Sequence, residues 1–146
     1  MALLSQIITV GLLATLAMTV FSYVLAYFTN SKFEEPQLLN ILIDRLPFIK
    51  SKISREHILG WSVHLCTGFF FIFLYLILQD HFNFETSILS GILLGIIGGL
   101  GGVFIWHFTF LLHPNPPSLK RVPFYAQLVI AHVIFGVCAI LLLKLF

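Results

Sequence analysis

Histidines are the residues of this sequence best suited to chemistry, and two of them recur in a matched pattern. His64 and Gly68 form a His-x-x-x-Gly sequence, which His132 and Gly136 repeat. A neutral imidazole can donate and accept hydrogen bonds, bind a metal ion or titrate near neutral pH. These two pairs are therefore the first candidates for a functional site.

Haem b is the most specific cofactor hypothesis for this pattern. His64 and His132 would be the opposed axial ligands, while Gly68 and Gly136 would make room one turn away for the flat macrocycle. The second hypothesis is a transition-metal site that uses His64, His107 and His132, although no carboxylate or thiolate joins this set. In either case the protein would be an electron-transfer or cofactor-binding subunit.

The interpretation favoured over both is structural, so no cofactor is the expectation. Each histidine would then bond a backbone carbonyl or one of Thr15, Thr19 and Tyr23 across the bundle, and would fix the helix register. Handling of a quinone, a proton or another small ligand is a further alternative. The sequence contains no Ser-His-Asp, Cys-His or Walker-type pattern, and Asp80 and Glu85 lie far from the histidines. We therefore assign no catalytic residue, and an independent enzyme is a minority interpretation.

Long apolar segments must position these histidines. Of the 146 residues, 59% are hydrophobic and 10% are charged, whereas soluble domains have about 45–50% and about 25%. Four apolar runs, at 5–28, 57–79, 88–112 and 124–146, each have about the 20 residues needed to cross a hydrocarbon core about 30 Å thick. The sequence predicts an all-α integral membrane four-helix bundle, a single domain in contact with the lipid bilayer. The net charge of +2 gives no indication of nucleic-acid binding.

Basic residues are concentrated on one side of the predicted bundle. The loops at 29–56 and 113–123 emerge together on that side. They contain seven of the eight lysine and arginine residues, namely Lys32, Arg45, Lys50, Lys52, Arg55, Lys120 and Arg121. Cytoplasmic loops are enriched in these residues, so we expect both loops in the cytoplasm and both termini outside.

The first of these loops contains a predicted helix of its own. The Glu-Glu-Pro run at 34–36 is typical of a helix start, because acids favour the positive end of the helix dipole. Polar residues then recur at helical spacing at Gln37, Asn40 and Asp44, beside an apolar surface. We expect a short amphipathic interfacial helix over 36–46. A plain connection that rests on the bundle is favoured over a docking element for a partner.

Small residues form stripes on the first and third spans. The stripe residues are Gly11, Thr15 and Ser22 on the first span and Gly91, Gly95, Gly98 and Gly102 on the third. Small side chains let helices approach closely in lipid, so we expect the two stripes to contact each other. A glycine-lined passage for a substrate or a lipid is the alternative. The matched histidine pairs on the second and fourth spans favour a duplicated helical hairpin, related by an axis along the membrane normal.

Three short motifs together are similar to those of a known group. They are Gly11-x-x-Ala14-Thr15-x-x-Met18-Thr19, Gly60-Trp61-x-x-His64-x-x-x-Gly68 with Tyr75, and His132-x-x-Phe135-Gly136. The chain resembles a group of small, uncharacterised four-helix bacterial inner-membrane proteins over nearly its whole length. The resemblance implies the topology and the bacterial inner (cytoplasmic) membrane, but no activity. The glycine-rich third span and His107 depart from the pattern of the group.

These observations lead to one functional expectation and two alternatives. We expect a non-catalytic accessory or scaffold subunit of a larger membrane complex, with other membrane proteins or further copies of the chain as partners. The first alternative is a haem b or metal-binding electron-transfer subunit that uses His64 and His132. The second is a small transporter that works as an oligomer.

Overall fold

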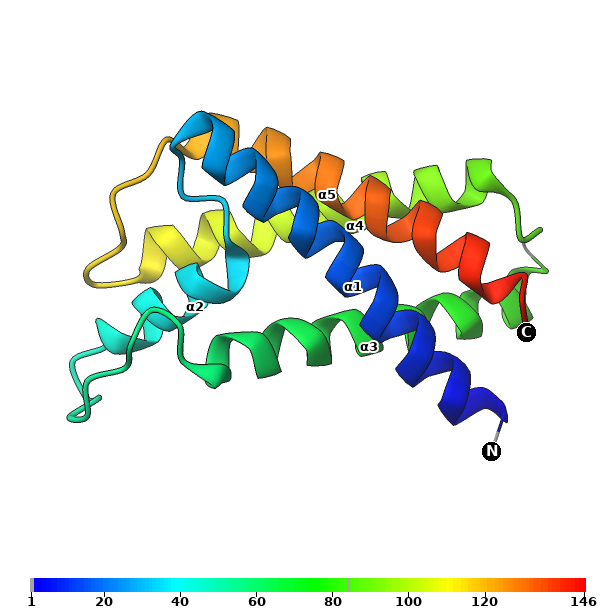
Figure 1. The fold of residues 1–146 in the computed structure, drawn as a ribbon, viewed down its shortest axis with the longest axis horizontal. Helices are drawn as coiled ribbons and strands as arrows, with labels where there is room; N and C mark the ends of the chain where they lie inside the picture. Colours follow the sequence, from blue (N-terminus) through cyan, green and yellow to red (C-terminus); the bar gives the residue numbers. More distant parts are fainter. Residues whose placement is uncertain (1, 84) are drawn as a thin grey trace.

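The computed structural model describes residues 2–83 and 85–146, and these residues form five helices and no strands. In chain order they are α1 (Ala2–Thr29), α2 (Glu35–Asp44), α3 (Ile58–Phe82), α4 (Ile88–Leu112) and α5 (Arg121–Leu143) (Figure 1). All but α2 are long and apolar enough to cross a membrane. The predicted all-α bundle is confirmed, and the chain is a multi-pass membrane protein. Every predicted helix agrees with the observed one to within three residues at each end.

Local signals explain where α3 begins and ends and where α4 begins. α3 begins after His57, whose Nδ1 accepts a hydrogen bond from the backbone N–H of Leu59 at 3.1 Å. It ends at Asn83, which adopts the left-handed conformation with φ 51°. α4 begins with a reciprocal capping box between Ser87 and Ser90. The short turn between the two helices is therefore defined by its own polar residues.

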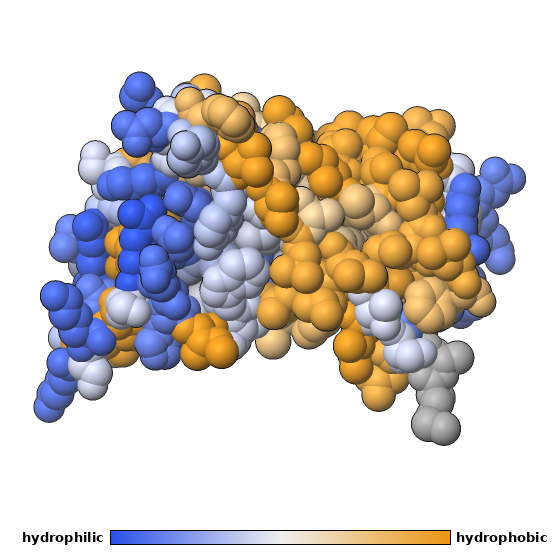
Figure 2. Space-filling view, in the orientation of Figure 1, coloured by the Kyte–Doolittle hydropathy of each residue, from blue (hydrophilic) through white to orange (hydrophobic). Residues whose placement is uncertain are grey.

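The molecule has two polar ends and a broad apolar band between them. Both termini lie at one end, and α2 with the two long loops lies at the other (Figure 1). Hydrophilic side chains gather at both ends, most of them around α2, and apolar side chains cover the middle (Figure 2). Lys32 Nζ donates a hydrogen bond to Ser118 O at 3.2 Å and so links the two long loops. We call this end, formed by 30–57 and 113–121, the basic end.

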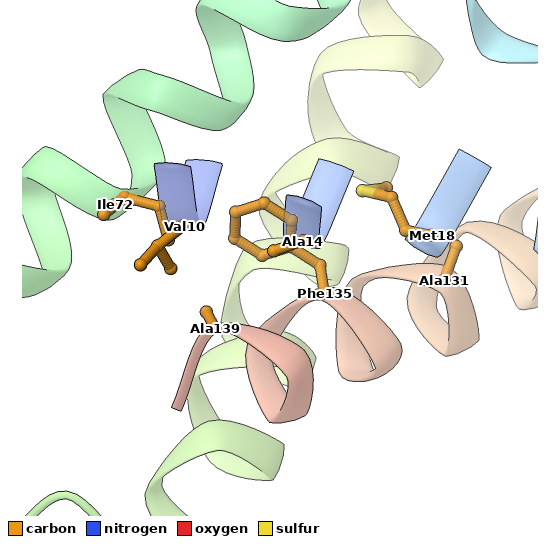
Figure 3. Close-up of a cluster of buried hydrophobic side chains, with 7 residues drawn as sticks. All are labelled: Val10, Ala14, Met18, Ile72, Ala131, Phe135 and Ala139. Atoms are coloured by element: carbon orange, nitrogen blue, oxygen red, sulfur yellow. The ribbon is translucent and has the colours of Figure 1, made fainter. Parts of the chain in front are cut away.

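The core has two clusters of buried apolar side chains. One lies towards the basic end around Phe124 and includes residues of α2 and α4. The other is built by α1, α3 and α5. Its buried side chains are Val10, Ala14, Met18, Ile72, Ala131, Phe135 and Ala139 (Figure 3). The Phe135 ring points from α5 towards Ala14 of α1. The extensive helix pairs are α4 with α5, α1 with α5, α1 with α3, and α2 with α3, whereas α3 and α4 are not such a pair among the described residues. α3 and α4 therefore have no extensive direct contact with each other.

The predicted contact between the two small-residue stripes is wrong, because each stripe faces a different helix. The glycines of α4 pack on α5: a Cβ built at Gly91 would lie 2.8 Å from Gly136 O, and one at Gly95 would lie 2.5 Å from His132 O. A side chain at Gly11 of α1 would collide with α3. Helical periodicity shows which residues share a face, but it does not show which helix covers that face.

α2 is docked on the start of α3 through Asn40. This residue belongs to the predicted polar face, but it is only 1% exposed because it packs on the start of α3. Its Nδ2 donates to Arg55 O at 3.0 Å and to His57 O at 2.6 Å, and its Oδ1 accepts from Gly60 N at 2.8 Å. The side chain is buried because it satisfies backbone groups where α3 begins. α2 therefore rests on the bundle, as the favoured prediction had it.

We expect Asn40→Leu to lower the free energy of unfolding by about 2–3 kcal/mol, because it leaves buried backbone donors and acceptors without partners. Chemical unfolding in detergent, followed by circular dichroism, measures this change. Asn115→Leu is the matched control, since Asn115 is exposed in the loop after α4. Equal stability of the two variants would contradict the anchoring role of Asn40.

Candidate functional site

A cavity of about 220 Å³ lies towards the basic end and brings His64 and His132 together. All five helices contribute to its wall, for example through Thr15, Glu35, His64, Trp106 and His132. Most of the remaining wall is apolar. This cavity therefore collects the few polar side chains inside the bundle, and it is the candidate functional site.

His64 reaches from α3 to α1 and has a defined tautomer. Its Nε2 lies 2.9 Å from Thr19 Oγ1, and this hydroxyl donates its only hydrogen to Thr15 O at 2.7 Å. Thr19 must therefore accept from His64, so Nε2 carries the ring hydrogen and Nδ1 keeps a lone pair. Within the described residues, His64 Nδ1 has no hydrogen-bond partner. The bond to Thr19 agrees with the structural interpretation of this histidine, and it leaves Nδ1 available to accept a hydrogen bond.

His132 has the opposite tautomer. Its Nδ1 lies 2.8 Å from Leu128 O on the same helix, so Nδ1 is the donor and Nε2 keeps the lone pair. The ring lies against two glycines of α4: a Cβ at Gly102 would be 3.5 Å from Nε2, and one at Gly98 would be 3.5 Å from Cδ2. Glycine has no hydroxyl group that could accept a hydrogen bond. His132 therefore bonds a carbonyl of its own helix, whereas His64 bonds a threonine of the neighbouring helix.

Gly68 and Gly136 make equivalent contacts in the two hairpins. A side chain at Gly68 would collide with Thr15 Oγ1 of α1, and one at Gly136 would collide with Gly91 O of α4. In each case the glycine admits the preceding span of its own hairpin, which agrees with the predicted duplication. The expectation that these glycines make room for a macrocycle is wrong, because neighbouring helices occupy the space beside them.

Glu35 is the candidate functional residue that sequence reasoning missed. It was expected only to start a helix, but its side chain enters the bundle and is 2% exposed. Its Oε1 accepts hydrogen bonds from Ser22 Oγ and from Gln127 Nε2, both at 3.0 Å. Its Oε2 has no partner among the described residues. Gln127 was the available signal, since an amide in an apolar span needs a buried polar partner.

The position of Glu35 changes its proton affinity. Burial raises the pKa of this carboxyl from 4.5 to about 7, and the neighbouring negative charge of Glu34 acts in the same direction. The hydrogen bonds from Gln127 and Ser22 oppose this rise only in part. A carboxyl group with this pKa takes up and releases a proton near neutral pH.

The structure does not bring His107 to this cavity. His107 is exposed on α4, and its Nδ1 lies 3.3 Å from Tyr125 Oη. Within residues 2–83 and 85–146, no three His, Cys, Asp or Glu side chains are placed to hold a metal ion. The expected set of His64, His107 and His132 is therefore not assembled. His107 lies instead beside Tyr125, near the start of α5.

A second cavity, of about 190 Å³, adjoins the first and is almost entirely apolar. Phe71, Ile105, His132 and Phe135 line both cavities. The second cavity lies between α3 and α4, where Gly101 has no atom within 4 Å of a Cβ built on it. The polar cavity thus continues into an apolar one that lies between α3 and α4 and is also lined by α5.

Comparisons with known proteins do not extend this description. No protein-family model matches the chain, and no curated protein or solved structure is significantly similar to it. The resemblance to small four-helix bacterial proteins therefore stays a prediction, and the function is argued from the two cavities.

Proposed function

We propose that the chain is a membrane-embedded binding protein for a small amphipathic molecule. The observation that carries this proposal is the pair of adjoining cavities, one containing Glu35, His64 and His132 and the other apolar. Ligand sites are typically apolar concavities in which a few polar groups fix the orientation of the ligand. A polar head group would lie in the first cavity and an apolar tail between α3 and α4.

The unpaired polar atoms support a ligand in addition to a structural role. Each histidine ring is held by one nitrogen, which leaves His64 Nδ1 and His132 Nε2 without a hydrogen-bond partner among the described residues. Glu35 Oε2 is also unpaired, and of these three atoms it alone is fully buried. A buried acceptor without a donor destabilises a fold by about 1–3 kcal/mol. A ligand that donates hydrogen bonds would remove this penalty.

An accessory or scaffold subunit of a larger membrane complex is the second candidate function. It is favoured by the exposure of α3 and α4, since only 17% of the membrane-spanning window of each is buried, against 39% for α1 and α5. Helices of another subunit, or of a second copy of the chain, would cover these faces. This function is compatible with a bound ligand.

The remaining alternatives have less support. The haem b hypothesis loses the space expected at Gly68 and Gly136, and the three-histidine metal set is not assembled. A small oligomeric transporter would use the same cavities. We place the chain in the bacterial inner membrane on the basis of the resemblance, and we place the basic end in the cytoplasm because of its lysines and arginines.

Gly101→Phe tests the binding function. Gly101 lines the apolar cavity, and nothing lies within 4 Å of a Cβ built on it, so we expect a phenyl ring there to enter the cavity without displacing a helix. We expect the wild-type protein, extracted in a gentle detergent, to retain an amphipathic molecule in native mass spectra. The variant should retain about tenfold less of it, which corresponds to about 1.4 kcal/mol of binding free energy.

The same sample separates the alternatives. A wild-type chain that carries no small molecule, or a Gly101→Phe variant with unchanged occupancy, would contradict the binding function. A stoichiometric partner chain in the mass spectrum would support the subunit function. A Soret absorption band in proportion to the protein would favour haem b.

A further inference from the structure

We infer that the polar cavity binds the protonated amine of an amphipathic ligand, with the ammonium group beside Glu35 and the hydrocarbon part between α3 and α4. This inference rests on the proposed binding function and names the chemical class of its ligand. It is carried by the donors, acceptors and charges of the cavity wall.

Hydrogen-bond acceptors predominate among the polar groups of the wall. His64 Nδ1 and His132 Nε2 hold lone pairs, because the other nitrogen of each ring is the donor. The hydroxyls of Thr67 and Thr109 donate to carbonyls of their own helices, at 2.9 and 2.8 Å, and so offer only lone pairs to a ligand. In its ionised form, Glu35 adds a fifth unpaired acceptor through Oε2. A ligand that fits this wall must supply donors.

The few donors of the wall are uncharged. They are the hydroxyl of Thr15 and the indole N–H of Trp106, and none of the described lysines and arginines lines the cavity. A buried carboxylate that lacks a cationic partner is strongly destabilised. A phosphate or carboxylate head group would place a second negative charge beside Glu35, whereas an ammonium would neutralise it. The indole ring of Trp106 also favours a cation.

An ammonium group fits the wall better than a metal ion or a hydroxyl group. Among the described residues, no three metal-ligating side chains are assembled here. An ammonium group has three donors, which match the acceptors of Glu35, His64 and His132, whereas a hydroxyl has a single donor and no charge. Neither a metal ion nor a short polar molecule would fill the adjoining apolar cavity of about 190 Å³.

The proton equilibrium of Glu35 adds a pH dependence to amine binding. Burial raises the pKa of the Glu35 carboxyl to about 7, and a neighbouring ammonium would lower it, so amine binding should strengthen as the pH rises from 6 to 8. An alkylamine stays protonated in this range, because its pKa is about 10. The titratable and charged groups around the carboxyl are Glu34, Arg55, Tyr23 of α1, His64 of α3 and His132 of α5.

Tryptophan fluorescence can report the ligand directly. The chain has two tryptophans, and Trp61→Phe leaves Trp106 in the cavity wall as the single reporter. The probes are three twelve-carbon molecules brominated on the chain: a primary amine, an alcohol and a carboxylic acid, each added at pH 8 in the same detergent. We expect the amine to quench Trp106 saturably at about tenfold lower concentration than the other two.

Two carboxyl variants test whether Glu35 causes the preference for the amine. Glu35→Gln should remove the advantage of the amine and its pH dependence. Glu34→Gln is the matched control, because Glu34 lies next in sequence and pairs with Arg55 at 3.5 Å, and it should retain both. If Glu35→Gln does not fold, amine binding to the Trp61→Phe protein is measured from pH 6 to 8. Amine affinity that does not change over this range would overturn the inference.

The possible outcomes separate the amine assignment from the binding function. Saturable quenching by the alcohol or the acid that equals or exceeds that by the amine would overturn the amine assignment and leave the binding function intact. No saturable quenching by any probe would overturn the binding function itself. An amine preference that survives Glu35→Gln would show that the buried carboxyl does not select the ligand.

Discussion

Gly95→Val is expected to lower the free energy of unfolding by about 3 kcal/mol, because the new side chain would force apart two closely packed helices. A Cβ at Gly95 would lie 2.5 Å from both His132 O and Val133 Cα. These are backbone atoms of α5, so no change of rotamer can move them away. The α4–α5 contact is the most extensive in the bundle, and its separation would also displace the His132 ring from the cavity.

Gly101→Val is the matched control for this substitution. It adds the same side chain to the same helix, but nothing lies within 4 Å of a Cβ at Gly101. We expect a change within about 0.5 kcal/mol, as for substitutions away from packed sites. Unfolding by denaturing detergent, with circular dichroism as the readout, measures both variants. An equal loss of stability in the two would mean that valine acts through the helix itself and not through the α4–α5 contact.

These two glycines also show how far the sequence predicts the fold. Hydropathy locates the four spans to within three residues, because bilayer thickness sets the length of an apolar run. Periodicity places Gly91, Gly95 and Gly98 on one face of α4. It cannot identify α5 as the neighbour, since in lipid the partner is chosen by shape, and the matching small residue is Gly136 of α5.

The candidate site was predictable only where its polar groups lie inside the spans. His64 and His132 stand out because imidazoles are rare in apolar segments, and Thr19 was an expected partner of the histidines. Glu35 lies before Pro36, where an acid normally starts a helix and faces water. Its burial depends on α2 folding back onto the start of α3, which brings Glu35 to Ser22 of α1 and Gln127 of α5. Local sequence does not encode this tertiary arrangement.

The stability of the wild-type protein is expected to fall as the pH rises from about 4.5 to about 7, through the ionisation of Glu35. In the folded protein this carboxyl has a pKa of about 7, above its ordinary value of 4.5. Between these values the folded state keeps a proton that the unfolded state has lost, so raising the pH favours unfolding. The full change from this group is about 3 kcal/mol, and it is flat below and above the window.

Glu35→Gln isolates this contribution because a neutral amide resembles the protonated acid in size and charge. The variant should lose the decline between pH 4.5 and 7 and should be more stable than the wild type at pH 8, with little difference at pH 4. Glu34→Gln should keep the decline, since Glu34 pairs with Arg55 near the surface. Unfolding titrations at pH 4, 6 and 8 measure the three proteins. The free energy of unfolding could instead vary with pH in the same way for the wild type and Glu35→Gln. That result would show that Glu35 ionises in the folded protein as it does in water, so its carboxyl would not be protonated at neutral pH.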